Sequence, residues 1–303
     1  MKTIKGIIPP MVTPLKGNDR IDCDGTARLT EHLLAGGVHA LFLLGTTGEA
    51  QSLSYKCRYD FVELVCRQVA GRVPVLVGVT DTSLDESLKL AIHARTCGAE
   101  GVVAAAPYYF APSQQELIEY FTALADALPL PLYLYNMPSH VKVFLEPATV
   151  STLADHPNIV GLKDSSANMT YFQTLLYGLG DREDFALYVG PEELTGESVV
   201  MGAAGGVNGG ANLFPELYVE MYHAAYKGDV NSMRTLQRRI MQIATTLYTV
   251  GKYGSSYLKG VKCALSLMGI CDDYLSYPYR KFRAGERDRI RKALEALGIR
   301  CVR

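Results

Sequence analysis

Short apolar segments recur along the chain at intervals of about thirty residues. They consist of consecutive Val, Ile, Leu and Ala residues rather than apolar and polar residues in alternation. Such continuous runs are typical of strands that are buried on both faces of a parallel sheet. Eight segments show this pattern, at residues 6–12, 38–44, 75–79, 101–106, 131–135, 159–163, 185–189 and 203–207. The sequence therefore predicts eight parallel strands.

Between these segments the apolar positions follow helical spacing, most clearly at residues 54–70, 83–97 and 113–127. Each of these three begins with a serine that can cap a helix, and Ser83 and Ser113 are followed three residues later by a glutamate. Glycines that fit helix C-caps follow, at Gly36-Gly37, Gly71 and Gly98. Eight strands alternating with helices favour a (β/α)₈ TIM barrel over a doubly wound α/β sheet.

The C-terminal residues 229–303 contain no convincing strand and instead show helical apolar stripes. Breaks near residues 251–254 and 269–272 divide this segment into about three additional helices. We therefore predict a catalytic barrel at residues 1–228 and a C-terminal helical extension at residues 229–303, which packs on the barrel or on another subunit.

Composition excludes several classes of function. The 303 residues include 30 basic and 31 acidic side chains, so the net charge of −1 offers no field for nucleic acid or for an anionic membrane. The seven cysteines never form C-x-x-C, and the six histidines show neither H-x-H nor H-E-x-x-H spacing. These patterns favour a reducing compartment and disfavour a disulfide framework or a metal site.

The start of the chain lacks the apolar run of a signal peptide, and no stretch reaches the ~20 apolar residues of a membrane span. We therefore expect a cytoplasmic protein with no nucleic-acid or membrane partner.

Polar groups of differing chemistry end five of the predicted strands, at residues 45–49, 107–109, 135–138, 163–166 and 205–210. Barrel enzymes carry their catalytic groups at the carboxyl ends of the strands. If the strands form one barrel, these five groups lie together at one end of it. This end is the predicted site.

Lys163 is the most specific of these candidates. It follows the apolar residues 159–162, so the strand carries it into an apolar interior, where lysine is rare unless it is paired or functional. Desolvation lowers the pKa of a lysine and yields the neutral amine that attacks a ketone. The alternative is an ion pair with Asp164 at the mouth of the strand, although the alternation of side chains along a strand points Asp164 to the opposite face.

Two further features have both a functional and a structural interpretation. The phenol of Tyr135, at the end of a strand, can transfer protons during imine formation, or it can pack at the rim as Tyr133 does on the same face. The turn Gly45-Thr46-Thr47-Gly48-Glu49 offers backbone N–H groups and two hydroxyls to a carboxylate or phosphate, or it simply caps the next helix. It is not a P-loop, because no Lys-Ser/Thr follows its second glycine.

Taken together, residues 6–14, 45–49, 107–109, 135–138 and 161–164 resemble the dihydrodipicolinate synthase and N-acetylneuraminate lyase family of class I pyruvate aldolases. The resemblance covers nearly the whole chain in order. It implies that Lys163 forms a Schiff base with pyruvate and that Tyr135 and Thr46 relay protons. Tyr109 resembles a tyrosine that reaches into the site of a neighbouring subunit.

The resemblance also implies how the keto acid is bound. Thr47 and Gly48 correspond to the cradle for the pyruvate carboxylate, and Val207 to the residue whose backbone carbonyl faces the imine. The family is usually a homotetramer built as a dimer of dimers. It uses no metal and no organic cofactor, and its other partner is an aldehyde or a 2-keto-3-deoxy acid.

The expected substrate depends on one departure from the family's patterns and on one match to them. Dihydrodipicolinate synthases usually carry an arginine where this chain has His140, and histidine lacks the bidentate fork that holds a second carboxylate. Gly190, Glu192 and Glu193 match the region where sialic-acid lyases hold sugar hydroxyls, although acidic residues also favour a helix N-terminus. We therefore expect an aldolase that cleaves or forms a 2-keto-3-deoxy acid with pyruvate as the keto component. The alternatives are 4-hydroxy-tetrahydrodipicolinate synthesis and dehydration of a 2-keto-3-deoxy sugar acid.

Overall fold

The computed structural model describes residues 3–302. The expectation that the start of the chain lacks a signal peptide includes residues 1 and 2, which lie outside the described residues. Eight parallel strands form one curled sheet in the order β1-β10-β9-β8-β7-β6-β5-β4. Their bounds are β1 (Gly6–Ile7), β4 (Leu41–Leu43), β5 (Val75–Gly78), β6 (Gly101–Ala105), β7 (Leu132–Asn136), β8 (Ile159–Asp164), β9 (Ala186–Val189) and β10 (Gly205–Gly206). All eight predicted strands are confirmed.

The chain beyond β1 lies beside β4, the strand at the other end of this order. Pro10 and Phe42 form an isolated parallel bridge. The Met11 N–H donates to the Phe42 carbonyl at 2.9 Å, and the Phe42 N–H donates to the Pro9 carbonyl at 3.0 Å. Because Pro9 and Pro10 have no N–H to donate, this connection is shorter than a full strand pair.

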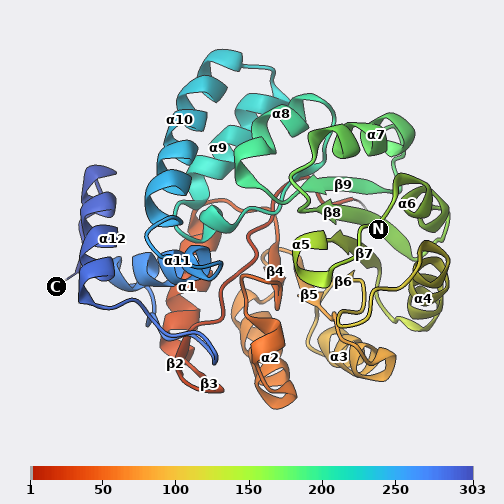
Figure 1. Ribbon diagram of the computed structural model, residues 1–303, viewed down its shortest axis with the longest axis horizontal. Coiled ribbons are helices and arrows are strands. Elements are labelled where there is room, and N and C mark those ends of the chain that lie inside the picture. The colour runs from red at the N-terminus through yellow and green to blue at the C-terminus, as the bar shows by residue number, and fades with distance from the viewer. Residues whose placement is uncertain (1–2, 303) are drawn as a thin grey trace.

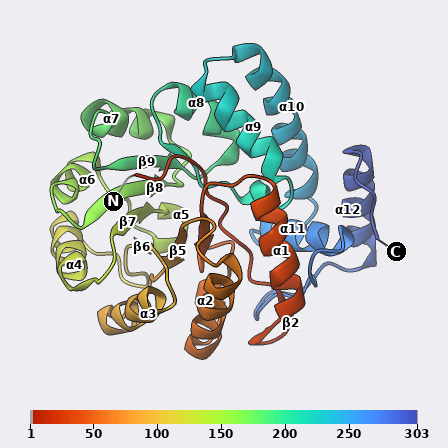
Figure 2. The same ribbon diagram turned by 180° about the vertical axis from the view of Figure 1, so that it is seen from behind.

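Helices surround the strands in both views (Figures 1 and 2). They are α1 (Cys23–Ala35), α2 (Tyr55–Val69), α3 (Leu84–Thr96), α4 (Gln114–Ala127), α5 (Pro138–Val141), α6 (Pro147–Ala154), α7 (Met169–Leu179), α8 (Thr195–Val200) and α9 (Pro215–Tyr226). The serines predicted to begin three of them do so: Ser54, Ser83 and Ser113 each accept from a backbone N–H in the first turn. Ser113 forms the complete capping box with Glu116.

Three further helices follow, as predicted: α10 (Val230–Leu247), α11 (Ser256–Leu267) and α12 (Ala284–Ala296). α10 contacts α9, and α11 contacts α10 and the 3₁₀ turn η3 (Gly209–Asn212), so the C-terminal helices pack on their own chain. Their apolar side chains, including Ile240 and Val261, belong to the same hydrophobic core as the sheet. Figures 1 and 2 place α11 between α12 and the sheet.

One pair of strands was not predicted. β2 (Leu15–Gly17) and β3 (Arg20–Ile21) form an antiparallel hairpin outside the sheet. Within residues 3–302, no helix combines the length and the apolar character needed to cross a membrane.

Candidate active site

Lys163 lies near the carboxyl end of β8 and is buried, with 6% of its surface exposed. Its Nζ lies 4.2 Å from the ring centroid of Tyr135 and 5.2 Å from that of Phe42. β7 pairs with β8 in a register that places Tyr135 directly beside Lys163. The amine is therefore held between two aromatic rings, away from bulk water.

The Asp164 carboxylate accepts hydrogen bonds from groups other than Lys163. It accepts from the Asn136 side chain at 2.8 Å, from the Ser166 N–H at 3.0 Å and from the Ser166 hydroxyl at 2.9 Å. Burial raises the pKa of Asp164 although these hydrogen bonds lower it. The side chain thus points to the opposite face from Lys163, as strand alternation predicts, and this geometry disfavours the ion-pair alternative.

Tyr135 connects the amine to the turn that follows β4. Its hydroxyl lies 3.3 Å from Thr46 Oγ1. Burial raises the pKa of this phenol, but Lys163 and polar contacts with Thr46 and Ser165 outweigh that effect, so its pKa lies below the ordinary value of 10.0. A phenol with a lowered pKa next to an amine suits the transfer of protons. The structure therefore brings Lys163, Tyr135 and Thr46 together.

The turn after β4 is held in an uncommon backbone conformation. Leu44 and Glu49, which flank it, both have a φ of 57°, in the left-handed region that non-glycine residues rarely occupy. The Gly48 N–H donates to the Gly45 carbonyl at 3.0 Å, so Gly48 itself has no free donor for a ligand. Among the described residues, none accepts a hydrogen bond from the N–H groups of Thr46 and Thr47, which leaves both for an anion.

Two residues of α11 also contact this turn, and sequence reasoning missed both. The Tyr257 hydroxyl lies 3.3 Å from Thr47 Oγ1. The Lys262 ammonium is fully buried and forms an ion pair with Glu49. Nothing in the local pattern points to Tyr257, whereas Lys262 stands within the apolar run 261–265, a signal of the same kind as that of Lys163.

A cavity of about 620 Å³ opens above these groups. Thr46, Tyr135 and Phe42 line it, and the Lys163 amine lies against the rings of Tyr135 and Phe42 without itself being part of the lining. The remaining walls come from several loops and from α11, and include Gln51, Ser52, Thr80, Tyr108, Met137, His140, Tyr253, Tyr257 and Tyr279. This lining contains no arginine and no lysine.

His140 lies at the mouth of this cavity on α5, with its Nδ1 2.9 Å from the Ser139 hydroxyl. The surrounding protein lowers its pKa by desolvation, so the imidazole is neutral at pH 7.

The other predicted residues lie away from the cavity lining. Glu192, in the 3₁₀ turn η2 (Glu192–Leu194), is buried: its carboxylate accepts from the hydroxyls of Tyr218 at 2.6 Å and Tyr248 at 2.7 Å and from the Gly210 N–H at 2.6 Å. Burial raises the pKa of Glu192. The η2 turn thus directs the Glu192 carboxylate toward α9 and the end of α10, where both of its oxygens are hydrogen-bonded within the protein.

Glu193 is partly exposed, and its carbonyl accepts from the Gln237 side chain at 2.7 Å. The Gly190 N–H donates to the Asp164 carbonyl at 2.7 Å. Val207 and Lys163 both line a small space of about 10 Å³. Tyr109 is 79% exposed and has a φ of 94°.

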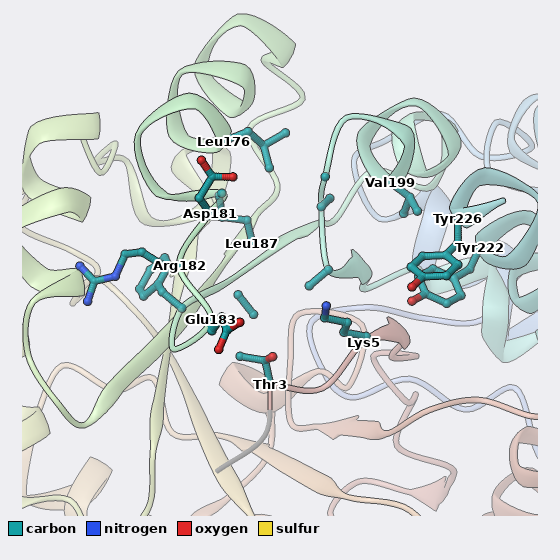
Figure 3. A pocket seen from close by; sticks show the side chains of 16 residues that line it. Thr3, Lys5, Leu176, Asp181, Arg182, Glu183, Leu187, Val199, Tyr222 and Tyr226 are labelled. Atoms are coloured by element: carbon teal, nitrogen blue, oxygen red, sulfur yellow. The ribbon is translucent and has the colours of Figure 1, made fainter. Parts of the chain in front are cut away.

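A second cavity, of about 940 Å³, lies at the amino-terminal ends of β1, β9 and β10 (Figure 3). Figure 3 shows the Lys5 amine directed into it, with Tyr222 and Tyr226 side by side on one wall. Arg182 is engaged by Asp155 at 2.7 Å and by Asp184 at 3.0 Å. Although this cavity is larger, it lies at the opposite end of the sheet from Lys163, and α/β barrels carry their chemistry at the carboxyl ends. The candidate active site is therefore the cavity above Lys163.

Comparisons with known proteins match nearly the whole chain to the same family. The model of the dihydrodipicolinate synthetase family matches residues 3–297. A 4-hydroxy-tetrahydrodipicolinate synthase of Hyphomonas neptunium is 37% identical over 97% of this chain and 98% of its own length. One of Geobacter metallireducens is 34% identical, with 94% and 96% covered.

Two solved structures are also similar. A dihydrodipicolinate synthase from Bacteroides thetaiotaomicron is 57% identical, with a TM-score of 0.95 and coverage of 98% of this chain and 99% of the other. YagE of E. coli K12, a prophage protein of the dihydrodipicolinic acid synthase family in complex with pyruvate, is 30% identical, with a TM-score of 0.91 and coverage of 97% and 99%.

Proposed function

The chain belongs to the dihydrodipicolinate synthetase family, and from this premise we propose that Lys163 binds pyruvate as a Schiff base and that the enzyme forms or splits a carbon–carbon bond at the pyruvate methyl carbon. Family membership makes the chain a pyruvate-dependent class I aldolase, a carbon–carbon lyase. The observation that carries the proposal is the buried Lys163 amine beneath Tyr135, which in turn contacts Thr46.

The proposed reaction begins when the neutral amine of Lys163 attacks the ketone carbon of pyruvate. The resulting carbinolamine loses water to give an imine, and Tyr135 carries the protons that this step requires. The protonated imine withdraws electrons from the methyl carbon, which loses a proton and becomes an enamine. The enamine carbon then attacks an aldehyde, and water finally hydrolyses the imine to release the product and the amine. Cleavage is the same sequence in reverse.

The turn after β4 supplies the proposed carboxylate site. The free N–H groups of Thr46 and Thr47 and the Thr47 hydroxyl hold the carboxylate, while Gly48 keeps the turn tight through its bond to Gly45. Fixing the carboxylate places the ketone near Lys163, which supplies proximity. We assign the backbone carbonyl of Val207, which shares the lining of the small space at Lys163, to the imine region.

We further propose that the sheet closes into a (β/α)₈ barrel through the bridge between Pro10 and Phe42, with residues 1–228 as the catalytic barrel and 229–303 as its extension. The exposure of Tyr109 and its neighbour Phe110 supports a contact with another subunit of a homotetramer, in which Tyr109 completes a neighbouring site. We also propose that the protein is located in the cytoplasm.

For the acceptor, the first candidate is 4-hydroxy-tetrahydrodipicolinate synthesis, the condensation of pyruvate with aspartate semialdehyde. The names of the relatives support it, and they support it better than the cleavage reaction that the sequence pattern alone suggested.

The second candidate is cleavage or dehydration of a 2-keto-3-deoxy sugar acid, and His140 favours it. The cavity lining offers a second carboxylate no arginine or lysine, whereas Gln51, Ser52, Thr80 and Tyr253 offer hydrogen bonds to hydroxyls. Glu192 does not contribute to this polar wall, because its oxygens are already bonded within the protein.

An assay of both directions separates the candidates. The purified enzyme is given pyruvate with aspartate semialdehyde, and separately a panel of 2-keto-3-deoxy acids with detection of released pyruvate. Condensation that H140R accelerates supports the synthase, because arginine adds the fork for a second carboxylate. Pyruvate release that H140R suppresses supports sugar-acid cleavage, and loss of water without pyruvate supports dehydration. Absence of all three activities would refute the proposed function.

A further inference from the structure

We propose that Tyr257 is a positioning residue for pyruvate binding: helix α11 holds the carboxylate-binding turn through the contact of Tyr257 with Thr47 and through the ion pair of Lys262 with Glu49. This inference rests on the proposed function and deepens it. It gives the C-terminal helices a role in substrate affinity.

The Tyr257 phenol is fitted into the site rather than resting on its surface. Its hydroxyl lies 3.3 Å from Thr47 Oγ1, and the residue lines the cavity above Lys163. A Cβ on Gly209 would lie 1.6 Å from the Tyr257 hydroxyl, so only glycine at position 209 leaves room for this phenol. The backbone of η3 and the side chain of Tyr257 therefore determine each other's position.

Either hydroxyl can donate in this contact, and we assign the donor role to the Tyr257 phenol. Burial raises the pKa of Tyr257, so the phenol is neutral and has one proton to donate. When that proton goes to the Thr47 oxygen, the proton of Thr47 is left for the pyruvate carboxylate. Hydrogen bonds in such a chain polarise one another, so the donation from Tyr257 strengthens the bond that Thr47 makes to the carboxylate.

The second contact of α11 fixes the end of the same turn. Lys262 pairs with Glu49 and also donates to the Tyr274 carbonyl at 2.8 Å, while the Ser276 N–H donates to the other Glu49 oxygen at 2.9 Å. Glu49 has a positive φ, so this anchor holds a backbone conformation that the chain does not favour on its own. One helix thus contacts the turn at positions 47 and 49.

Packing against Tyr248 fixes the orientation of the Tyr257 ring. Tyr248 of the α10 C-cap packs edge-to-face on it, with ring centroids 4.9 Å apart, and the Tyr248 hydroxyl donates to the buried Glu192 at 2.7 Å. Glu192, which sequence reasoning assigned to the substrate, therefore acts on the site through this aromatic contact.

The test measures the pyruvate concentration that gives half-maximal borohydride trapping on Lys163, which needs no knowledge of the aldehyde. Y257F should raise this concentration about 2- to 10-fold, the usual effect of one hydrogen bond, while the amount trapped at saturating pyruvate stays near that of the wild type. Y226F is the matched control, since Tyr226 is exposed in the cavity at the opposite end of the sheet, and it should change nothing. Circular dichroism checks that each variant is folded.

A second comparison separates a positioning role from a general loss of packing. In a T47V background the further substitution Y257F should have no additional effect, because the group through which Tyr257 acts is gone. An equal increase in both backgrounds, or no increase with Y257F alone, would overturn the inference while leaving the Schiff base intact. If the wild type traps no pyruvate at Lys163, the proposed function fails and the inference fails with it.

Discussion

Replacement of Lys262 by methionine should destabilise the protein far more than loss of a surface ion pair would. The Lys262 side chain is 0% exposed and that of its partner Glu49 is 1% exposed. In K262M the Glu49 carboxylate keeps the Ser276 N–H as a donor but loses its counter-charge, and the Tyr274 carbonyl loses the donor that Lys262 supplied. Breaking a buried ion pair from one side typically costs about 3–5 kcal/mol. For a chain of 303 residues that corresponds to a decrease in Tm of about 5–8 °C.

The matched control is K281M. Lys281 pairs with Asp273 at 3.2 Å but is 60% exposed, so its removal should cost at most about 1 kcal/mol. Urea unfolding of both variants at one protein concentration gives the comparison, because assembly also affects apparent stability. E49Q/K262M should recover part of the loss, since the amide carries no charge to bury. The reasoning is refuted if K262M unfolds with the free energy of K281M, and a double variant as unstable as K262M would show that lost packing, not the orphaned charge, is the cause.

Three further outcomes follow from the site. Y135F should lower kcat about 100-fold or more, because the proton carrier of imine formation is lost; activity within a few-fold of wild type would contradict this. Burial raises the pKa of Glu192 above 4.5, so the stability that this group contributes is present at low pH and is lost as the pH rises through its folded-state pKa. Relative to wild type, E192Q should therefore gain stability in urea as the pH rises above 4.5, and a difference independent of pH would exclude that explanation. Y109A should remain folded but sediment as a smaller assembly with reduced turnover, whereas an unchanged sedimentation coefficient would remove Tyr109 from the subunit contact.

The strands could be predicted from the sequence because burial on both faces requires continuous apolar runs. The lengths of the strands could not be predicted, as the N-terminal strand shows. The apolar run extends over residues 6–12, but β1 ends at Ile7, since the following prolines cannot donate to a ladder. The hairpin of β2 and β3 was not predicted because its strands are very short. Its turn contains Asp19 with a φ of 49°, a conformation that aspartate tolerates in turns.

The site could be predicted only where strand geometry alone determines position. Adjacent parallel strands bring Tyr135 beside Lys163 whatever the helices do. Tyr257 is separated from Thr47 by 210 positions, and its contact depends on how α11 packs, which no local pattern encodes. Glu192 follows a strand as expected, yet the direction of its side chain is set by the hydroxyls of two distant helices.

The central claim is most directly tested by incubating the wild-type protein with pyruvate, adding borohydride and mapping the modified peptide by mass spectrometry. The account predicts a reduced pyruvate adduct on Lys163 and on no other lysine, with Lys262, which is also buried, left unmodified because its amine is engaged by Glu49. An unmodified Lys163 at saturating pyruvate, or an adduct that forms equally well in K163A, would contradict it.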